Sequence, residues 1–231
     1  MESRLDILID LLHRCPDAAL ATHSLALPGY PFATALPFAT DVQHRPVLLI
    51  STLAEHTQNL AADPRASLLV RVSLAEGEVA RATVVGNVAP IEAEPLLVER
   101  YLRYQPDAER LLPFGDFRFF RLEPVRIRII GGFGQAGWLD GDRLGVLPQG
   151  FPPVTPRLTL AAERGLLDAV VAPAAVTLLG VDCFGFDLRV AGERQRIVFE
   201  KGPLAAGDVA AALRGAVDRI PVQGFSGRSM E

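Results

Sequence analysis

The sequence predicts an α+β protein, with an antiparallel β-barrel or sandwich in residues 1–147 and a small α/β domain in residues 157–231. Five or six strand-like segments follow one another in the N-terminal part with turn-sized connections, whereas parallel strands would need a helix-length crossover. Residues 148–156 contain four prolines and a glycine, a composition typical of a linker between domains. These two observations predict the fold class and the domain boundary.

The bulk composition is that of an ordinary globular protein. Of the 231 residues, 49% are hydrophobic and 22% charged, which argues against disorder. The net charge of −4 gives no indication of a nucleic acid partner. The charged N-terminus is unlike a signal peptide, and no apolar run approaches the roughly 18 residues of a membrane span. The two cysteines, Cys15 and Cys183, fit unpaired thiols in a reducing compartment. We therefore expect a cytoplasmic protein that binds neither nucleic acid nor membrane.

The first element is an amphipathic helix over residues 3–14. Leu5, Leu8 and Leu12 recur at the spacing of one helix face, and Pro16 ends the pattern. We expect this helix to pack its apolar face against the neighbouring strands.

Two strands follow, over residues 18–24 and 31–39, joined by a turn at Pro28 and Gly29. The second strand alternates between two faces with period two, so that Thr34 and Leu36 face one way and Ala35 and Pro37 the other. Pro37 has no N–H to donate to a neighbouring strand, which indicates a sheet edge or a bulge.

The remaining elements are recognised by apolar runs, helical spacing and turn residues. In the N-terminal part these are strands over 46–52, 66–73, 79–89 and 117–130 and helices over 55–62 and 92–105, with Glu76 and Gly77 as a hairpin turn. After the linker we expect a helix over 158–171, strands over 175–181, 186–190 and 194–200, a helix over 206–219 and a loose tail over 223–231.

One segment has the composition of an anion site. Ser51, Thr52, His56, Thr57 and Asn59 run from a buried strand into the start of a helix. Hydroxyl, imidazole and amide groups beside free helix N–H groups can bind a phosphate. The alternative is purely structural, because Thr52 with a glutamate three residues on is also a capping box. The residues leave both interpretations open.

Other chemistry motifs are missing from the sequence. There is no phosphate loop of the Walker kind and no Gly-x-Ser-x-Gly, and residues 131–134 lack the spacing of a dinucleotide-binding turn. The four histidines do not have the spacing of a zinc protease, so we predict no metal site. No pair of residues is identifiable as a catalytic acid and base, and the catalytic residues stay unassigned.

Several segments resemble the pyridoxamine 5'-phosphate oxidase-like split-barrel family, and most closely its branch linked to haem utilisation. They are Gly-Tyr-Pro-Phe-Ala-Thr (residues 29–34), Leu-Ile-Ser-Thr-Leu-Ala-Glu-His-Thr-Gln-Asn-Leu (residues 49–60), Asp-Pro-Arg-Ala-Ser-Leu-Leu-Val (residues 63–70) and the stretch 114–139. After the linker, residues 179–189 resemble the small C-terminal domain that often follows this barrel. Together these segments span nearly the whole chain.

The resemblance implies a six-stranded antiparallel split β-barrel of Greek-key type with flanking helices. It implies a homodimer that binds FMN at the interface between two barrels. The phosphate would lie on Ser51, Thr52, His56, Thr57 and Asn59, and the isoalloxazine ring beside the strand that carries Thr34, Ala35, Leu36 and Pro37. Trp138 is a weaker candidate for the same site.

Two departures from the family pattern keep other functions open. Residues 31–39 carry no basic residue and the segment 51–59 offers only His56, although charge-assisted bonds are the stronger ones to a phosphate. No histidine follows His56, so a haem ligand would have to be an early histidine, a cysteine or a tyrosine. We expect an FMN-binding flavoprotein that acts as an oxidoreductase; the alternatives are a haem-binding protein and a non-enzymatic dimeric binding protein without cofactor.

Overall fold

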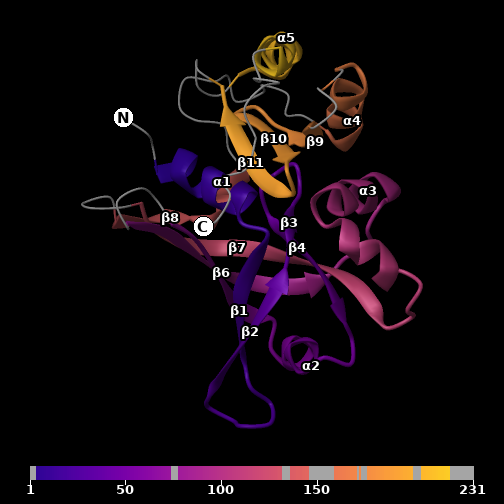
Figure 1. Cartoon of the computed structure of the whole chain (residues 1–231). Helices are drawn as coiled ribbons and strands as arrows, with labels where there is room; N and C mark the ends of the chain where they lie inside the picture. The colour runs from indigo at the N-terminus through magenta and orange to yellow at the C-terminus, as the bar shows by residue number, and fades with distance from the viewer. Residues whose placement is uncertain are drawn as a thin grey trace, which may run out of the picture. The chain divides into compact units, whose positions relative to one another are not determined.

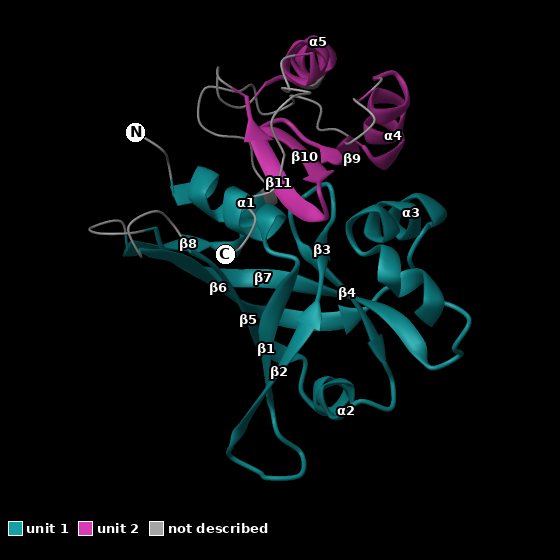
Figure 2. Cartoon of the chain, viewed as in Figure 1, with its two compact units in different colours: residues 1–147 teal, residues 148–231 magenta. Residues whose placement is uncertain are grey.

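The computed structural model describes residues 4–73, 78–131, 136–145, 159–170, 172, 176–199 and 204–218. The expected linker 148–156, the turn at Glu76 and Gly77, most of the glycine run 131–134 and the tail 223–231 lie outside these residues. The chain divides into two compact units, residues 1–147 and 148–231 (Figure 2). Each unit is described separately below.

Unit 1 contains one antiparallel sheet of eight strands (Figure 1). The sequence predicts six strands; the structure divides the predicted strand 31–39 at Phe38 into β2 and the short β3, and it adds the short β8. The strands are β1 (Asp17–His23), β2 (Pro31–Pro37), β3 (Ala39–Thr40), β4 (Pro46–Ser51), β5 (Arg65–Ser73), β6 (Val79–Pro90), β7 (Phe117–Ile130) and β8 (Ala136–Asp140).

The strand order is β2-β1-β5-β6-β7-β4-β3, with β8 paired to β7. Strands β5, β6 and β7 are neighbours in sequence, and β4 lies beside β7, which is a Greek-key arrangement. The path starts at β2 and ends at β3, which only Phe38 separates in sequence. The sheet therefore curls until its two ends meet, as a split barrel requires. The edge position predicted from Pro37 is confirmed, because β2 is the first strand of the path.

Helix α1 (Arg4–Arg14) supplies part of the core of unit 1. Its side chains Leu8, Leu11 and Leu12 are fully buried and pack against the inner face of the sheet, where Leu68 and Ile127 are also fully buried. Replacing one such leucine by alanine costs about 2 to 5 kcal/mol in comparable cores. This helix fixes which face of the sheet is inside, and the opposite face is left to solvent.

Helix α3 (Pro95–Tyr104) buries one charged side chain. Arg100 is only 1% exposed. Its guanidinium donates a 2.7 Å hydrogen bond to the carbonyl oxygen of Thr40 and lies over the ring of Tyr104. Arg100 thus attaches the helix to β3, and the hydrogen bond explains why a cation is tolerated there.

Unit 2 is a three-stranded antiparallel sheet with two helices. The elements are α4 (Leu160–Asp168), β9 (Val176–Val181), β10 (Gly185–Val190), β11 (Glu193–Val198) and α5 (Ala206–Val217), in the sheet order β11-β10-β9. Phe186, Leu188 and Leu213 lie in its own hydrophobic core. The guanidinium of Arg196 is buried between the carboxylates of Asp182 and Asp187, at 2.9 Å from each.

Among the described residues, no helix has the length and apolar character needed to cross a membrane.

Candidate functional site

The outer face of the barrel sheet carries a continuous row of residues across six strands. Ala35 on β2 pairs with Ala19 on β1, which pairs with Leu69 on β5. The row continues through Thr83 on β6 and Arg128 on β7 to Trp138 on β8. Directly opposite residues of an antiparallel sheet point to the same side. Ala35 and Trp138, both site candidates from the sequence, therefore belong to one surface.

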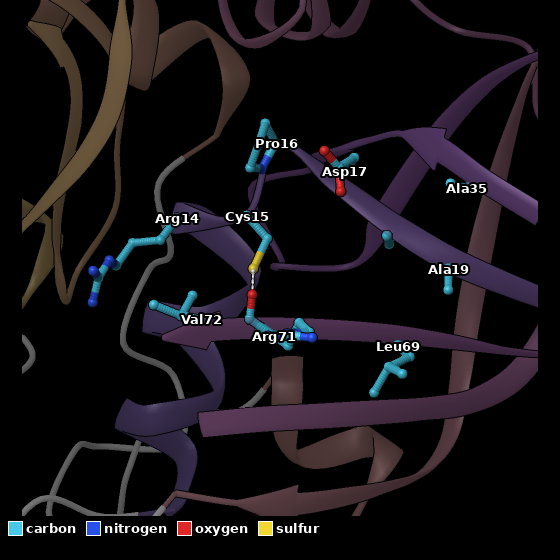
Figure 3. A pocket seen from close by; sticks show the side chains of 10 residues that line it. Arg14, Cys15, Pro16, Asp17, Ala19, Ala35, Leu69, Arg71 and Val72 are labelled. Carbon is cyan, nitrogen blue, oxygen red and sulfur yellow. Dashed lines mark hydrogen bonds between the residues drawn. The ribbon is translucent and has the colours of Figure 1, made fainter. Parts of the chain in front are cut away.

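A pocket of about 390 Å³ opens at the β2 end of this row (Figure 3). Ala19, Ala35 and Leu69 give it an apolar surface, and Arg14 and Arg71 bring positive charge to it. Its volume lies within the range of small-molecule pockets. The complete lining is Arg14, Cys15, Pro16, Asp17, Ala18, Ala19, Ala35, Leu69, Arg71 and Val72.

Cys15 is part of this lining but its thiol is engaged. The residue is 4% exposed, and Figure 3 shows its sulfur directed at the carbonyl oxygen of Arg71, to which it donates a 3.4 Å hydrogen bond. Cys15 and Cys183 are both buried, and neither forms a disulfide. Cys15 therefore ties the end of α1 to β5 beside the pocket.

Arginines dominate the other end of the outer face. Arg126 and Arg128 on β7 both lie over the ring of Trp138, with guanidinium carbons 5.2 and 5.7 Å from its centroid. Trp138 is 48% exposed, so its ring belongs to the surface and not to the core. Two cations on one aromatic ring form a basic, partly apolar surface.

The strand that carries the predicted ring-binding residues presents them to two different sides. Ala35 and Pro37 are exposed on the outer face, and Ala35 lines the pocket. Leu36 is 5% exposed and belongs to the barrel core, while Thr34 is half-buried on the same inner side. Of these four residues, the structure therefore brings Ala35 to the pocket.

The predicted phosphate segment makes its own hydrogen bonds around Asp116. The hydroxyl of Ser51 donates to the Asp116 carboxylate, and the N–H of Leu53 donates to Ser51 Oγ at 3.1 Å. The N–H of Thr52 donates to the Asp116 carbonyl oxygen at 2.8 Å. Sequence reasoning missed Asp116, because it lies 65 residues from Ser51 and no local pattern connects them.

Helix α2 (Glu55–Ala62) has the predicted bounds but not the predicted cap. Its N-cap is Ala54, and no side chain caps the helix. Thr52 lies outside the helix, so the capping box that was the alternative for this segment is not formed. The difference arises because residues 51–54 form a turn, in which the N–H of Ala54 donates to the carbonyl oxygen of Ser51.

Two polar side chains of α2, those of Thr57 and Asn59, are turned away from solvent. Asn59 is 1% exposed, accepts a bond from the N–H of Leu25 at 2.9 Å and donates to Thr22 Oγ1 at 3.0 Å. His56 Nε2 and Thr57 Oγ1 are buried and make no hydrogen bond within the described part of the chain. Asn59 therefore attaches α2 to the loop that joins β1 and β2.

The electrostatics of this segment suit a phosphate poorly. It contains no arginine or lysine, and burial lowers the pKa of His56, which favours the neutral imidazole. The Asp116 carboxylate adds negative charge beside Ser51. It stays a prediction that a cofactor binds to Ser51, Thr52, His56, Thr57 and Asn59. The positive charge of the barrel surface lies elsewhere, around the pocket and on β6 and β7.

The four histidines occupy two kinds of environment. His13 and His44 are buried, and their rings are joined by a 2.9 Å hydrogen bond between Nε2 and Nδ1. His56 is half-buried on α2. His23 is exposed at the end of β1, on the same face as Ala19. Of the four histidines, which the sequence leaves as candidate haem ligands, His23 is therefore the exposed one on the outer face.

Fold and pocket together define an antiparallel split-barrel protein with a ligand-sized, partly basic hollow on the outside of its sheet. Residues 9–144 match the family described as CREG, beta-barrel, which is more than half of the chain. The chain belongs to this CREG β-barrel family. The expected likeness to pyridoxamine 5'-phosphate oxidase-like proteins is consistent with that placement at the level of the barrel fold.

Similar proteins include several whose names refer to haem. The chain is 28% identical over 186 residues to the chloroplastic "Non-canonical heme oxygenase HOZ" of Arabidopsis thaliana, covering 74% of this chain and 58% of that protein. It thus spans little more than half the length of this curated relative.

Two solved structures share the fold over most of the chain. A heme binding protein from Mycobacterium smegmatis is 24% identical with a TM-score of 0.58, covering 90% of this chain and 96% of that one. A protein of unknown function from Agrobacterium tumefaciens is 24% identical with a TM-score of 0.70, covering 90% and 93%. These likenesses establish the fold.

Proposed function

We propose that this chain binds haem in the pocket on the outer face of its barrel. The observation that carries the proposal is the pocket itself, in which Ala19, Ala35 and Leu69 form an apolar surface beside the cations of Arg14 and Arg71. Haem is a flat apolar ring with two carboxylate groups, so it needs both features next to each other. The names of the Arabidopsis and Mycobacterium relatives support the same choice of ligand.

The residues fit haem better than they fit the phosphate of FMN. Small side chains leave a flat face for a ring, and arginine is well suited to hydrogen-bond carboxylates. His23, the exposed histidine of this face, lies about 13 Å along β1 from Ala19, four residues at the rise of a strand, so its imidazole does not reach iron held above that alanine. When bound, haem would supply iron redox chemistry, while this chain holds the ring and its carboxylates.

A titration of the purified chain with haem tests the proposal. We expect a shifted Soret band that saturates at one haem per chain. Ala35→Trp should fill the pocket and weaken binding at least tenfold. Ala33→Trp is the matched control, since Ala33 is exposed on the same face of the same strand but does not line the pocket. A Soret band that never departs from that of free haem would refute haem binding, and equal effects of both substitutions would place haem elsewhere.

FMN binding is the second candidate function, and the position of Ala35 favours it. The family resemblance places the isoalloxazine ring beside residues 34–37, and Ala35 lines the pocket. Because the segment around Ser51 lacks a fixed positive charge, we expect FMN to bind more weakly than haem. Quenching of flavin fluorescence on addition of the protein measures this affinity, and tighter binding of FMN than of haem would reverse the order of the two candidates.

We further propose that the chain forms a homodimer through the outer face of the barrel sheet. Leu69 on β5 and Val85 on β6 are exposed there, at 37% and 38%. A second copy would cover these apolar side chains and close the open side of the pocket. The oligomeric state in solution, measured by analytical ultracentrifugation, tests this proposal.

A further inference from the structure

Two arginines of the outer face are placed as a pair of like charges. Arg71 on β5 lies directly opposite Arg81 on β6 in the antiparallel register, and both side chains are exposed. Directly opposite residues have their Cβ atoms about 5 Å apart, and like charges at that spacing destabilise a sheet. The pair therefore needs a counter-charge that the two strands do not supply.

No carboxylate in the described part of the chain forms an ion pair with either of these two arginines. Other arginines of the protein are neutralised at close range. Arg45, Arg65, Arg121 and Arg196 all have a carboxylate oxygen within 3.1 Å. Arg71 and Arg81 thus differ from these residues in having free guanidinium donors beside each other.

The pair adjoins the apolar part of the pocket. Arg71 lines the pocket, and Leu69 lies two residues earlier on the same face of β5. The lining brings one carboxylate, that of Asp17, which is one negative charge against the two positive charges of the pair. Arg14 also lines the pocket, but Asp10 pairs with it at 3.2 Å. A flat ligand lying on Ala19 and Leu69 would therefore extend its edge toward Arg71 and Arg81.

We infer that Arg71 and Arg81 together form the anion-binding part of this pocket and take the paired carboxylates of a flat apolar ligand. This inference rests on the proposed haem binding and specifies which end of the pocket holds the propionate groups. A guanidinium group can donate two parallel hydrogen bonds to a carboxylate, so two arginines suit two carboxylates. The bound anions would also remove the repulsion between the two cations.

The test compares haem with its dimethyl ester, in which both carboxylates are blocked. The proteins are the full chain, Arg71→Gln, Arg81→Gln, the double variant, and Arg65→Gln as control. Arg65 lies on the same strand and face as Arg71, but Asp63 already neutralises it, and removing it causes the same change of charge. Each protein is titrated with each porphyrin in the same trace of detergent, and dissociation constants are taken from the Soret region.

We expect the double variant to bind haem about tenfold to a hundredfold more weakly than the wild type, the range given by one or two charge-assisted hydrogen bonds. The ester should bind the wild type and the double variant equally, and Arg65→Gln should match the wild type with both ligands. Unchanged haem affinity in the double variant would overturn the inference while leaving haem binding intact. An equal loss for haem and ester would do the same, since it would indicate a distorted pocket. A wild-type protein that binds neither porphyrin would refute the proposed function itself.

A second measurement needs no ligand. If the two cations repel each other in the free protein, Arg71→Gln or Arg81→Gln should raise its melting temperature by about 1 to 3 °C at low salt. High salt screens the repulsion and should shrink this gain. A lower melting temperature for both variants would mean that the arginines stabilise the free fold, and the argument from uncompensated charge would fail.

Discussion

The hydroxyl of Ser51 donates a hydrogen bond to the carboxylate of Asp116, which joins the end of β4 to the loop before β7. We therefore expect the two side chains to stabilise the fold as a unit. Ser51→Ala and Asp116→Ala should each lower the free energy of unfolding, and the double variant should lose about 1 kcal/mol less than the sum of the two. Urea unfolding of the four proteins at neutral pH measures this coupling. Strict additivity would mean that the bond contributes nothing in solution.

Asn59 should act on stability rather than on a ligand. Its buried amide connects Leu25 to Thr22, and Asn59→Ala would leave the N–H of Leu25 and the hydroxyl of Thr22 without that partner. We expect a loss of about 2 kcal/mol in the free energy of unfolding. Gln58→Ala, at the exposed neighbouring position, should change stability by less than about 0.5 kcal/mol. If Asn59→Ala abolished FMN binding without loss of stability, the assignment of Asn59 to the cofactor would be the better one.

Local patterns in the sequence predict most of the helices and strands, but not how distant segments meet. Helix α2 has the bounds read from the sequence because its spacing and the following Asp63-Pro64 are local signals. The pairing of Arg71 with Arg81 could not be read in the same way. A two-residue turn centred on Glu76 and Gly77 would place Arg71 opposite Ala82, and a register shift of one residue moves a side chain to the other face. Asp116 was missed because only the folded sheet brings it to Ser51.

The ion triad of unit 2 gives a prediction for that unit alone. Arg196→Met would leave Asp182 and Asp187 as buried carboxylates without their cation. Breaking a buried pair in this way typically costs about 3 to 5 kcal/mol. The two carboxylates strongly raise the pKa of Arg196, so this cation stays charged at any accessible pH.

Hydrogen exchange of the β10 amides in the full chain measures the effect within unit 2. The control is Arg164→Met, which removes an exposed ion pair with Asp168 and should cost less than about 0.5 kcal/mol. Because protonation would relieve two unpaired carboxylates, the defect of Arg196→Met should shrink as the pH falls toward 4. A defect no larger than that of the control would show that the triad is not stabilising.

A substitution of Val85 tests the proposed dimer without changing the pocket. The side chain is 38% exposed on the outer face of β6 and is not part of the pocket lining. Val85→Asp should place a charge in the buried interface and convert dimers to monomers at micromolar concentration, as sedimentation velocity would reveal. Leu53→Asp changes a more exposed apolar residue, at 75%, in the turn before α2 and should leave the dimer intact. Dissociation by both substitutions would place the interface elsewhere.

The lowered pKa of His56 predicts a specific pH dependence of the free energy of unfolding. Burial lowers its pKa below the ordinary value of 6.5, so the unfolded chain binds a proton more readily than the folded one. The contribution of the neutral imidazole is therefore fully present above pH 6.5 and declines as the pH falls through that value toward the lowered pKa. His56→Gln cannot titrate, and its free energy of unfolding should fall less than that of the wild type between pH 7.5 and 5. Chemical unfolding at several pH values gives both curves. Parallel curves would mean that the imidazole is protonated as easily in the folded chain as in the unfolded one. His56 could then carry the positive charge that an anion site beside Ser51 requires.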